Sequence, residues 1–325
     1  MTKAIRIHAY GGPEAMSWED VEVGEPGAGE VLVRHTAVGL NFIDVYMRSG
    51  QYPQPAFPAG IGLEGAGVVE AVGAGVDDVA AGDRVAYAGG PPGSYCESRL
   101  MPAAQLVTIP EGLDDNQAAA MMLKGMTAEY LLRRTYSVKS GDTILFHAAA
   151  GGVGLIACQW AKHLGATVIG TVGTGEKAEL AAAHGCDHPI IVCEENFVAK
   201  VRDITDGAGV PVVYDSVGKA TFNGSLDCLA PLGMMVLFGQ SSGAVPTFEI
   251  ATLGAKGSLF LTRPSLMAYN AKREALLASA AALFEVTAGG QVKIEINQTY
   301  ALVDVVQAHT DLEARKTTGS TVLLP

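Results

Sequence analysis

The hydrophobic and polar positions of the chain follow two different patterns. Over residues 1–110, short apolar or alternating runs are separated by turns that contain glycine and proline. Many short strands at this spacing are typical of a β-barrel or a sandwich. We expect strands at residues 4–8, 31–38, 66–72, 84–87 and 105–109.

The second pattern begins near residue 115, where strand-like and helix-like segments alternate. Two helices are expected at residues 118–123 and 127–134, joined near Gly125. Buried strands that alternate with helices indicate an α/β fold with a doubly wound parallel sheet. The expected strands are 143–148, 167–172, 189–192, 210–214, 234–238 and 258–262, and the expected helices are 153–164, 176–184, 195–204, 220–229 and 269–288. We expect the short tail that follows to return to the β-rich part.

Length and composition narrow the class of protein. A chain of 325 residues is about twice the length of a common domain, so two domains are expected. The net charge of −12 argues against a nucleic-acid partner, because phosphate binding needs clustered positive charge. No run of about 18 apolar residues, no leader segment and no paired cysteines are visible, so we expect a cytoplasmic protein without membrane contact.

The clearest chemical signal is the stretch TILFHAAAGGVGLIACQWAKHLGA. A strand ends at His147, a helix follows at once, and Ala149, Gly151 and Gly154 occupy the three positions of the dinucleotide-binding fingerprint. These positions need small residues because the turn is tight, the backbone approaches a pyrophosphate, and the helix packs on the strand. The free N–H groups of the helix N-terminus then bind the phosphates. The sequence therefore predicts a dinucleotide cofactor.

The end of the following strand indicates which dinucleotide binds. An NAD site places Asp or Glu there to hold the ribose 2′-hydroxyl, but the segment TVGTGEK has Gly173 at this point. Thr174 can bind a 2′-phosphate and Lys177 can neutralise it, whereas Glu176 lies where it compensates the helix dipole. We interpret this pattern as an NADPH site.

Residues 141–162 (GDTILFHAAAGGVGLIACQWAK) resemble the signature of zeta-crystallin-type quinone oxidoreductases, in the medium-chain dehydrogenase/reductase superfamily. The segments GLNFIDVYMRSGQYP, GLEGAGVVEAVGAGV, LKGMTAEYLL, YDSVG, FGQSSG and TRPS are similar to bacterial members, so the resemblance covers the whole chain. It implies a GroES-like β-barrel catalytic domain at 1–124, a Rossmann NADPH-binding domain at 125–263, and a C-terminal segment, 264–325, that returns to the catalytic domain. It also implies NADPH-dependent reduction of a small-molecule quinone.

Zinc alcohol dehydrogenases of the same superfamily need cysteine and histidine ligands that this chain lacks. Asn41 and Leu63 stand at two of the ligand positions, the third falls near Lys124, and only Cys96 occurs where a four-cysteine lobe would be. We therefore expect no metal. An electron-poor quinone accepts hydride directly if the protein orients it.

The resemblance also implies the site residues. Asn41, Tyr46 and Tyr52 are the candidate catalytic residues, although the two tyrosines could instead only close the barrel edge. Asp44 and His147 are interpreted as structural rather than catalytic. The cofactor contacts implied are Asn41, Tyr46, Lys124, Thr127, Tyr130, Gly151, Gly152, Val153, Gly173, Thr174, Lys177, Ser216, Phe238, Gly239, Gln240, Ser241, Thr262, Arg263 and Arg315.

The sequence differs from its relatives at one position near the cofactor, and two alternative functions are considered. Val192 and Cys193 replace a tyrosine that relatives carry near the adenosine phosphate, which leaves the preference for NADPH to Lys177 and Arg315. The alternatives are a reductase of α,β-unsaturated aldehydes or ketones, and an NADPH-binding protein with a structural or RNA-binding role. The apolar strand 258–262 is expected at a sheet edge, where it favours a homodimer.

Overall fold

The computed structural model describes all residues, 1–325, and divides them into two units. The first unit contains Met1–Lys124, Lys272–Phe284 and Ile294–Pro325, and the second contains Gly125–Ala271 and Glu285–Lys293. The chain thus rejoins the first unit at Lys272 rather than at residue 264, and it leaves that unit once more over Glu285–Lys293.

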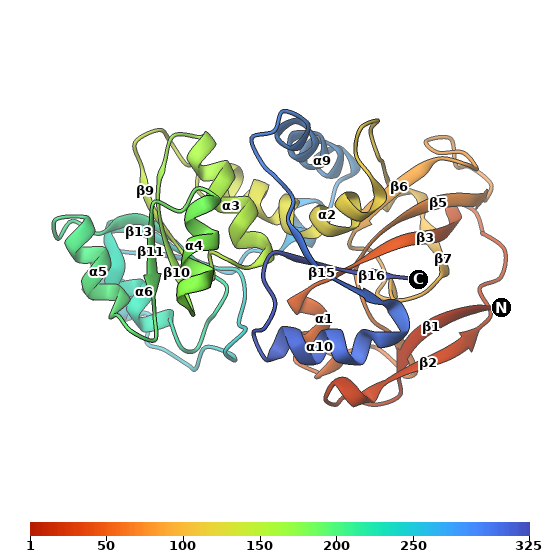
Figure 1. The fold of residues 1–325 in the computed structure, drawn as a ribbon, viewed down its shortest axis with the longest axis horizontal. Coiled ribbons are helices and arrows are strands. Elements are labelled where there is room, and N and C mark those ends of the chain that lie inside the picture. The colour runs from red at the N-terminus through yellow and green to blue at the C-terminus, as the bar shows by residue number, and fades with distance from the viewer. The chain divides into compact units, whose positions relative to one another are not determined.

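Two sheets form the β-rich part of the first unit (Figure 1). The larger sheet has the order β15-β16-β3-β5-β6-β8, with β7 paired to β3, and the smaller sheet has the order β2-β1-β4. The strands are β1 (Thr2–Ile7), β2 (Met16–Val21), β3 (Glu30–Leu40), β4 (Ala59–Gly60), β5 (Glu64–Val72), β6 (Arg84–Ala88), β7 (Ser98–Pro102), β8 (Val107–Thr108), β15 (Ile296–Ala301) and β16 (Ser320–Leu324).

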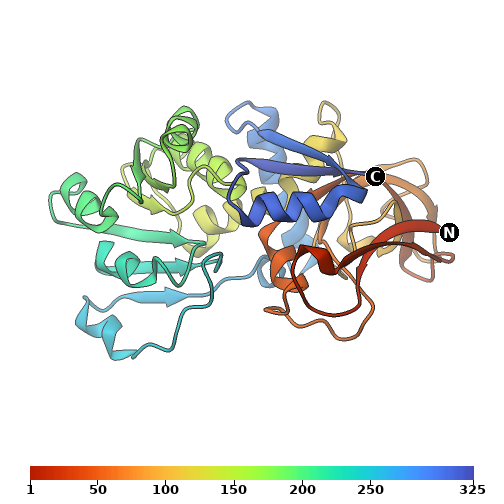
Figure 2. The same cartoon turned by 60° about the horizontal axis from the view of Figure 1, so that its bottom comes forward.

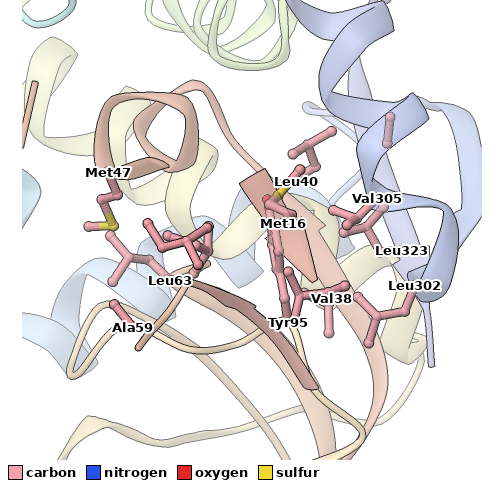
Figure 3. Packing of buried hydrophobic residues seen from close by; sticks show 14 residues of the cluster. Met16, Val38, Leu40, Met47, Ala59, Leu63, Tyr95, Leu302, Val305 and Leu323 are labelled. Carbon is pink, nitrogen blue, oxygen red and sulfur yellow. The ribbon is translucent and has the colours of Figure 1, made fainter. Parts of the chain in front are cut away.

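The C-terminal elements of the first unit complete its core. Helix α10 (Val305–Glu313) lies along β15 and β16 in both views (Figures 1 and 2). Leu302 and Val305 join Val38 and Leu323 in a cluster of buried apolar residues (Figure 3). Because β16 pairs with β3, the returning tail supplies both a strand and a covering helix.

The second unit is a six-stranded parallel sheet with the order β11-β10-β9-β12-β13-β14. In chain order this is 3-2-1-4-5-6, the order of the Rossmann fold, so the expected α/β doubly wound sheet is confirmed. The strands are β9 (Thr143–Phe146), β10 (Thr167–Val172), β11 (His188–Ile191), β12 (Val210–Asp215), β13 (Leu229–Leu237) and β14 (Phe260–Thr262). The helices between them are α3 (Gly152–His163), α4 (Gly175–Ala183), α5 (Phe197–Ile204), α6 (Phe222–Cys228) and α7 (Ala251–Ala255).

Several helical segments differ from the expectation, and α7 is one that was not expected. α2 (Asp115–Tyr130) is one helix that passes through Gly125 and continues into a π-helical turn, Leu131–Thr135, whereas a break at the glycine was expected. An interior glycine costs about 1 kcal/mol, which the buried side chains on either side of it offset. The expected helix 269–288 is two helices, α8 (Leu266–Tyr269) and α9 (Arg273–Ala288). Helix α1 (Phe42–Arg48) was not expected.

No helix is both long and apolar enough to cross a membrane.

Candidate functional site

In the second unit, most of the expected cofactor residues follow the carboxyl ends of the parallel strands. The turn after β9 comes first: Ala148 has a φ of 55°, and Gly151 is the N-cap of α3. A Cβ on Gly154 would lie 2.3 Å from the Ala148 carbonyl oxygen and 2.6 Å from that of Ala149, so helix and turn approach more closely than any side chain allows. Gly152 and Val153 form the first turn of α3, whose N–H groups can bind an anion.

The turn after β10 carries the residues expected to select the cofactor. The Thr174 hydroxyl caps α4 by accepting from the Lys177 backbone N–H at 3.3 Å. A hydroxyl that accepts in this way can still donate its own proton to an anion. Gly173 has no atom within 4 Å of the Cβ position, and the Cys193 thiol donates to the Gly173 carbonyl oxygen at 3.3 Å. This turn is therefore open, with a basic residue half-buried beside it.

The ends of β12 and β13 are joined by hydrogen bonds. The Asp215 Oδ1 atom accepts from the N–H groups of Val217 and Gly218 at 2.7 and 2.9 Å, which fixes the loop that carries Ser216. The Ser216 carbonyl oxygen then accepts from the Ser241 N–H at 3.1 Å. The remaining expected contacts on this edge are Phe238, Gly239, Gln240, Thr262 and Arg263. The centroid of the Phe238 ring lies 5.6 Å from that of Phe146. Thr262 ends β14, and Arg263 donates to the Leu237 carbonyl oxygen at 3.0 Å.

The two other expected contacts of the second unit, Thr127 and Tyr130, lie on α2. Thr127 is buried, and the Tyr130 ring stacks on that of Tyr269 with centroids 4.5 Å apart. Burial raises the pKa of Tyr130, so its hydroxyl stays protonated at physiological pH. Tyr130 is itself buried, so its neutral hydroxyl and its stacked ring are covered by protein.

In the first unit, the N-terminus of α1 brings together the residues expected at the reacting end. Asn41 is the N-cap of α1 and is buried, and its Nδ2 donates to Glu64 Oε2 at 2.7 Å. Lys124 Nζ also binds Glu64 Oε2, at 3.2 Å, and the Leu123 N–H donates to Oε1 at 2.6 Å. Two expected cofactor residues therefore share one buried carboxylate, which the sequence reasoning missed.

The two candidate tyrosines are in contact. The Tyr46 and Tyr52 ring centroids lie 5.2 Å apart, the planes are inclined by 61°, and Phe42 packs on Tyr46 with centroids 5.4 Å apart. The Tyr52 N–H donates to the Tyr46 carbonyl oxygen at 2.9 Å. Tyr46 is buried and Tyr52 is partly exposed, so Tyr52 is the more accessible ring.

Asp44 on α1 belongs to a buried polar network. Asp44 Oδ2 accepts from the Asn41 N–H at 2.9 Å and from the Tyr95 hydroxyl at 2.8 Å, and Tyr95 also contacts His309 Nε2 at 3.1 Å. Burial raises the pKa of Asp44 to about 7, and burial together with the Arg48 charge lowers that of His309 to about 3. As the pH falls, the Asp44 carboxyl group of this network therefore takes up a proton well before the His309 imidazole does.

His147 belongs to a second buried network, in the second unit. Its Nδ1 lies 2.8 Å from the Thr171 hydroxyl and its Nε2 lies 2.9 Å from that of Ser225, which in turn donates to Asp215 Oδ2 at 2.9 Å. Burial lowers the pKa of His147. The side chain is fully buried and both ring nitrogens have partners, which fits the structural interpretation of this histidine.

Arg315 is the expected cofactor contact nearest to the C-terminus of the chain. It follows the end of α10, has a φ of 59°, and donates its backbone N–H to the Leu312 carbonyl oxygen at 3.0 Å. Its local backbone role is to end that helix. No group of three or more His, Cys, Asp or Glu residues is arranged to hold a metal ion.

Known families match both units. The alcohol dehydrogenase GroES-like domain family matches residues 27–135, and the zinc-binding dehydrogenase family matches residues 152–279. Together with the Rossmann sheet, these matches define the class: the chain is a medium-chain dehydrogenase/reductase.

Individual relatives define the family within that class. A quinone oxidoreductase of Pseudomonas aeruginosa is 55% identical over 325 residues and is covered completely, as is this chain. The solved structure of Escherichia coli quinone oxidoreductase complexed with NADPH has a TM-score of 0.98 at 47% identity, and the match covers 99% of this chain and 100% of that one. The 2-haloacrylate reductase of a Burkholderia species is 48% identical over 332 residues, which is 100% of this chain and 99% of the relative. The chain belongs to the quinone oxidoreductase family.

Proposed function

We propose that the protein is an enzyme that reduces quinones with NADPH by hydride transfer that needs no metal. The observation that carries the proposal is the carboxyl edge of the Rossmann sheet: a turn that only small residues fit, followed by a strand tip with Thr174 and Lys177 in place of a carboxylate. A carboxylate at that tip would repel a 2′-phosphate, whereas a lysine attracts it. The relatives named quinone oxidoreductase support the same reading.

The residues of the second unit hold the cofactor. The N–H groups of Gly152 and Val153, at the start of α3, bind the pyrophosphate. Thr174 and Lys177 bind the 2′-phosphate, with Arg315 as a second cation, and the loops of Ser216 and Ser241 line the same edge of the sheet. When bound, NADPH supplies the hydride.

The residues of the first unit orient the reacting groups. Tyr46 and Tyr52 provide an aromatic surface for a flat ring, and Asn41 and Lys124 supply polar contacts. A reduced quinone oxygen can take its proton from water, so the tyrosines orient the substrate and need not donate the proton. Asp44 is buried behind α1 and hydrogen-bonded there, which leaves it out of the chemistry.

The second candidate is reduction of an activated alkene, and the 2-haloacrylate reductase among the relatives favours it. NADPH oxidation should be measured side by side with benzoquinone, naphthoquinone, an alkenal series and a 2-haloacrylate. We expect the highest kcat/KM for a quinone. A haloacrylate or alkenal that exceeds both quinones tenfold would replace the first proposal by the second, and no oxidation with any of them would refute both.

We further propose a homodimer of a cytoplasmic protein without nucleic-acid partners. β14 is an edge strand of the parallel sheet, and the Phe260 side chain on it is 57% exposed. An unpaired edge with an exposed apolar side chain favours pairing with a second copy. The cytoplasmic location is supported by the cysteines, because all five are free, as in proteins of reducing compartments. Light scattering at micromolar concentration should give twice the chain mass, and Phe260→Lys should shift it to the monomer. A wild-type monomer would contradict the dimer.

A further inference from the structure

Residues 49–58 form the loop between α1 and β4, and this loop carries Tyr52. The elements at its two ends are fixed in the core of the first unit: Met47 of α1 and Ala59 of β4 belong to the same cluster of buried apolar residues (Figure 3). The loop itself contains three prolines, which have no N–H group. Its middle therefore has few backbone donors by which the rest of the unit can hold it.

Tyr10, which follows β1, contacts this loop at three points. Its hydroxyl accepts from the Gln54 N–H at 2.7 Å and donates to the Gln54 carbonyl oxygen at 3.4 Å. Its ring meets that of Phe57 edge to face, with centroids 4.9 Å apart. A Cβ on Gly50, whose φ is 83°, would lie 2.9 Å from two carbons of the Tyr10 ring, so this ring packs directly on the Gly50 backbone. One side chain thus contacts the start, the middle and the end of the loop.

Tyr52 lies between two of these points, two residues after Gly50 and two before Gln54. The Gln54 Nε2 atom donates to the Tyr52 carbonyl oxygen at 3.3 Å, and the Tyr52 N–H donates to the Tyr46 carbonyl oxygen at 2.9 Å. All of these residues belong to the first unit. The Tyr52 backbone is therefore held from α1 on one side and from Tyr10, through Gly50 and Gln54, on the other.

We propose that Tyr10 is a positioning residue that holds the Tyr52 ring in place for the quinone. The Tyr10 hydroxyl acts through the loop and does not need to touch the substrate. The proposal rests on the proposed function, because it takes Tyr52 as part of the aromatic surface that orients a quinone. The Tyr10 side chain is 40% exposed, and a small change at such a surface position has little effect on stability. Its effect on the substrate can therefore be separated from an effect on folding.

Tyr10→Phe tests the proposal, because it removes the hydroxyl and keeps the ring against Gly50 and Phe57. The Gln54 N–H then loses its acceptor. We expect kcat/KM for naphthoquinone to fall about 2- to 13-fold, the value of one hydrogen bond. Tyr10→Ala should lower it further, because the ring contacts are lost as well. The melting temperature of Tyr10→Phe should match that of wild type, and its NADPH dissociation constant, followed by NADPH fluorescence, should stay within about twofold.

A double-mutant cycle shows whether Tyr10 acts through Tyr52. In Tyr52→Ala the ring that the loop positions is absent, so adding Tyr10→Phe should lower kcat/KM by less than about 1.5-fold. The full effect of Tyr10→Phe in that background would show that Tyr10 does not act through Tyr52. Tyr300→Phe is the matched control, because it removes a hydroxyl bonded to Asp311 Oδ2 at 3.1 Å in the same unit, outside the loop. It should match wild type in kcat/KM and in NADPH binding.

Hydrogen exchange of the Gln54 backbone N–H gives a readout that does not depend on turnover. With ¹⁵N-labelled glutamine, its signal is identified by its loss in Gln54→Ala. In wild type this N–H should exchange with water at least about tenfold more slowly than in Tyr10→Phe, because only wild type offers the phenol oxygen as acceptor.

The outcomes separate the proposal from the proposed function. Equal exchange of the Gln54 N–H in the two proteins, an unchanged kcat/KM in Tyr10→Phe, or a fall that is matched by weaker NADPH binding would overturn the role of Tyr10 and leave quinone reduction in place. Wild type that binds NADPH and reduces no quinone would instead refute the proposed function, and the role of Tyr10 toward a quinone with it.

Discussion

Asp44→Asn should raise the free energy of unfolding relative to wild type, by an amount that grows as the pH rises from 4 to 8. The Asp44 carboxyl is fully buried, Oδ2 has two donors, and Oδ1 has no hydrogen-bond partner. Burial raises the pKa of Asp44 from its usual 3.8 to about 7. Between these values the unfolded chain releases the proton and the folded chain retains it, so rising pH favours unfolding; below pH 4 and above pH 8 the contribution is constant.

The size of this effect follows from the shift. A shift from 3.8 to about 7 is worth about 4 kcal/mol, of which roughly 2.5 kcal/mol falls between pH 5 and pH 8. Asparagine keeps the shape, accepts the same two hydrogen bonds through its oxygen, and does not ionise. The free energy of unfolding of the variant should therefore lose this part of its pH dependence.

The assay compares urea unfolding of wild type and variant from pH 4 to pH 8.5. The lowered pKa values of His309 and His35 act in the opposite sense, since they weaken the fold as the pH falls below about 6.5. Both histidines are present in both proteins, so the difference between the two curves isolates Asp44. An infrared carboxylic-acid band that titrates near pH 7 and is missing in the variant gives a second readout. Parallel unfolding curves, or no such band, would refute the reasoning.

Three further outcomes are expected. Lys177→Ala should weaken NADPH about tenfold or more and leave NADH nearly unchanged, because one charge-assisted hydrogen bond to the 2′-phosphate is lost; equal weakening of both in a binding titration would contradict the assignment. Tyr52→Phe should lower kcat only about 2- to 13-fold, the value of one neutral hydrogen bond, whereas a hundredfold fall at unchanged NADPH affinity would make Tyr52 a proton donor. Gly154→Ala should lower the melting temperature and weaken NADPH, because its Cβ meets the Ala148 carbonyl oxygen at 2.3 Å; Gly254→Ala, with no atom within 4 Å, is the control and should do neither.

Features set by neighbouring residues could be predicted from the sequence. The strand at residues 167–172 has the expected bounds, and the turn after β9 was identified because its glycines lie within a few residues of one another. Helix α1 was missed because seven residues in a β-rich region carry little periodic signal. Its stability comes from packing, since Val45, Tyr46 and Met47 are all buried.

Features set by distant residues could not be predicted. Glu64 binds Asn41 across 23 residues and Lys124 across 60, and no local pattern encodes such contacts. The available signal was a glutamate inside the otherwise apolar and glycine-rich segment GLEGAGVV, where a charge must have a partner. Asp215, at the end of the buried strand in YDSVG, carries the same kind of signal.

The hydrogen bonds around His147 run from donor to acceptor in a fixed order. This order restricts which substitutions the sequence can accept during evolution. Ser225 donates its proton to Asp215, so it must accept from His147 Nε2, and the Nδ1 atom must then accept from Thr171. His147 and Ser225 each donate to one neighbour and accept from the other, so neither of them, nor Thr171, can be replaced alone without leaving a buried polar atom unsatisfied. Among homologues, positions 147, 171 and 225 should therefore be substituted together, with apolar side chains replacing all three at once, while Asp215 persists because it also holds the loop after β12.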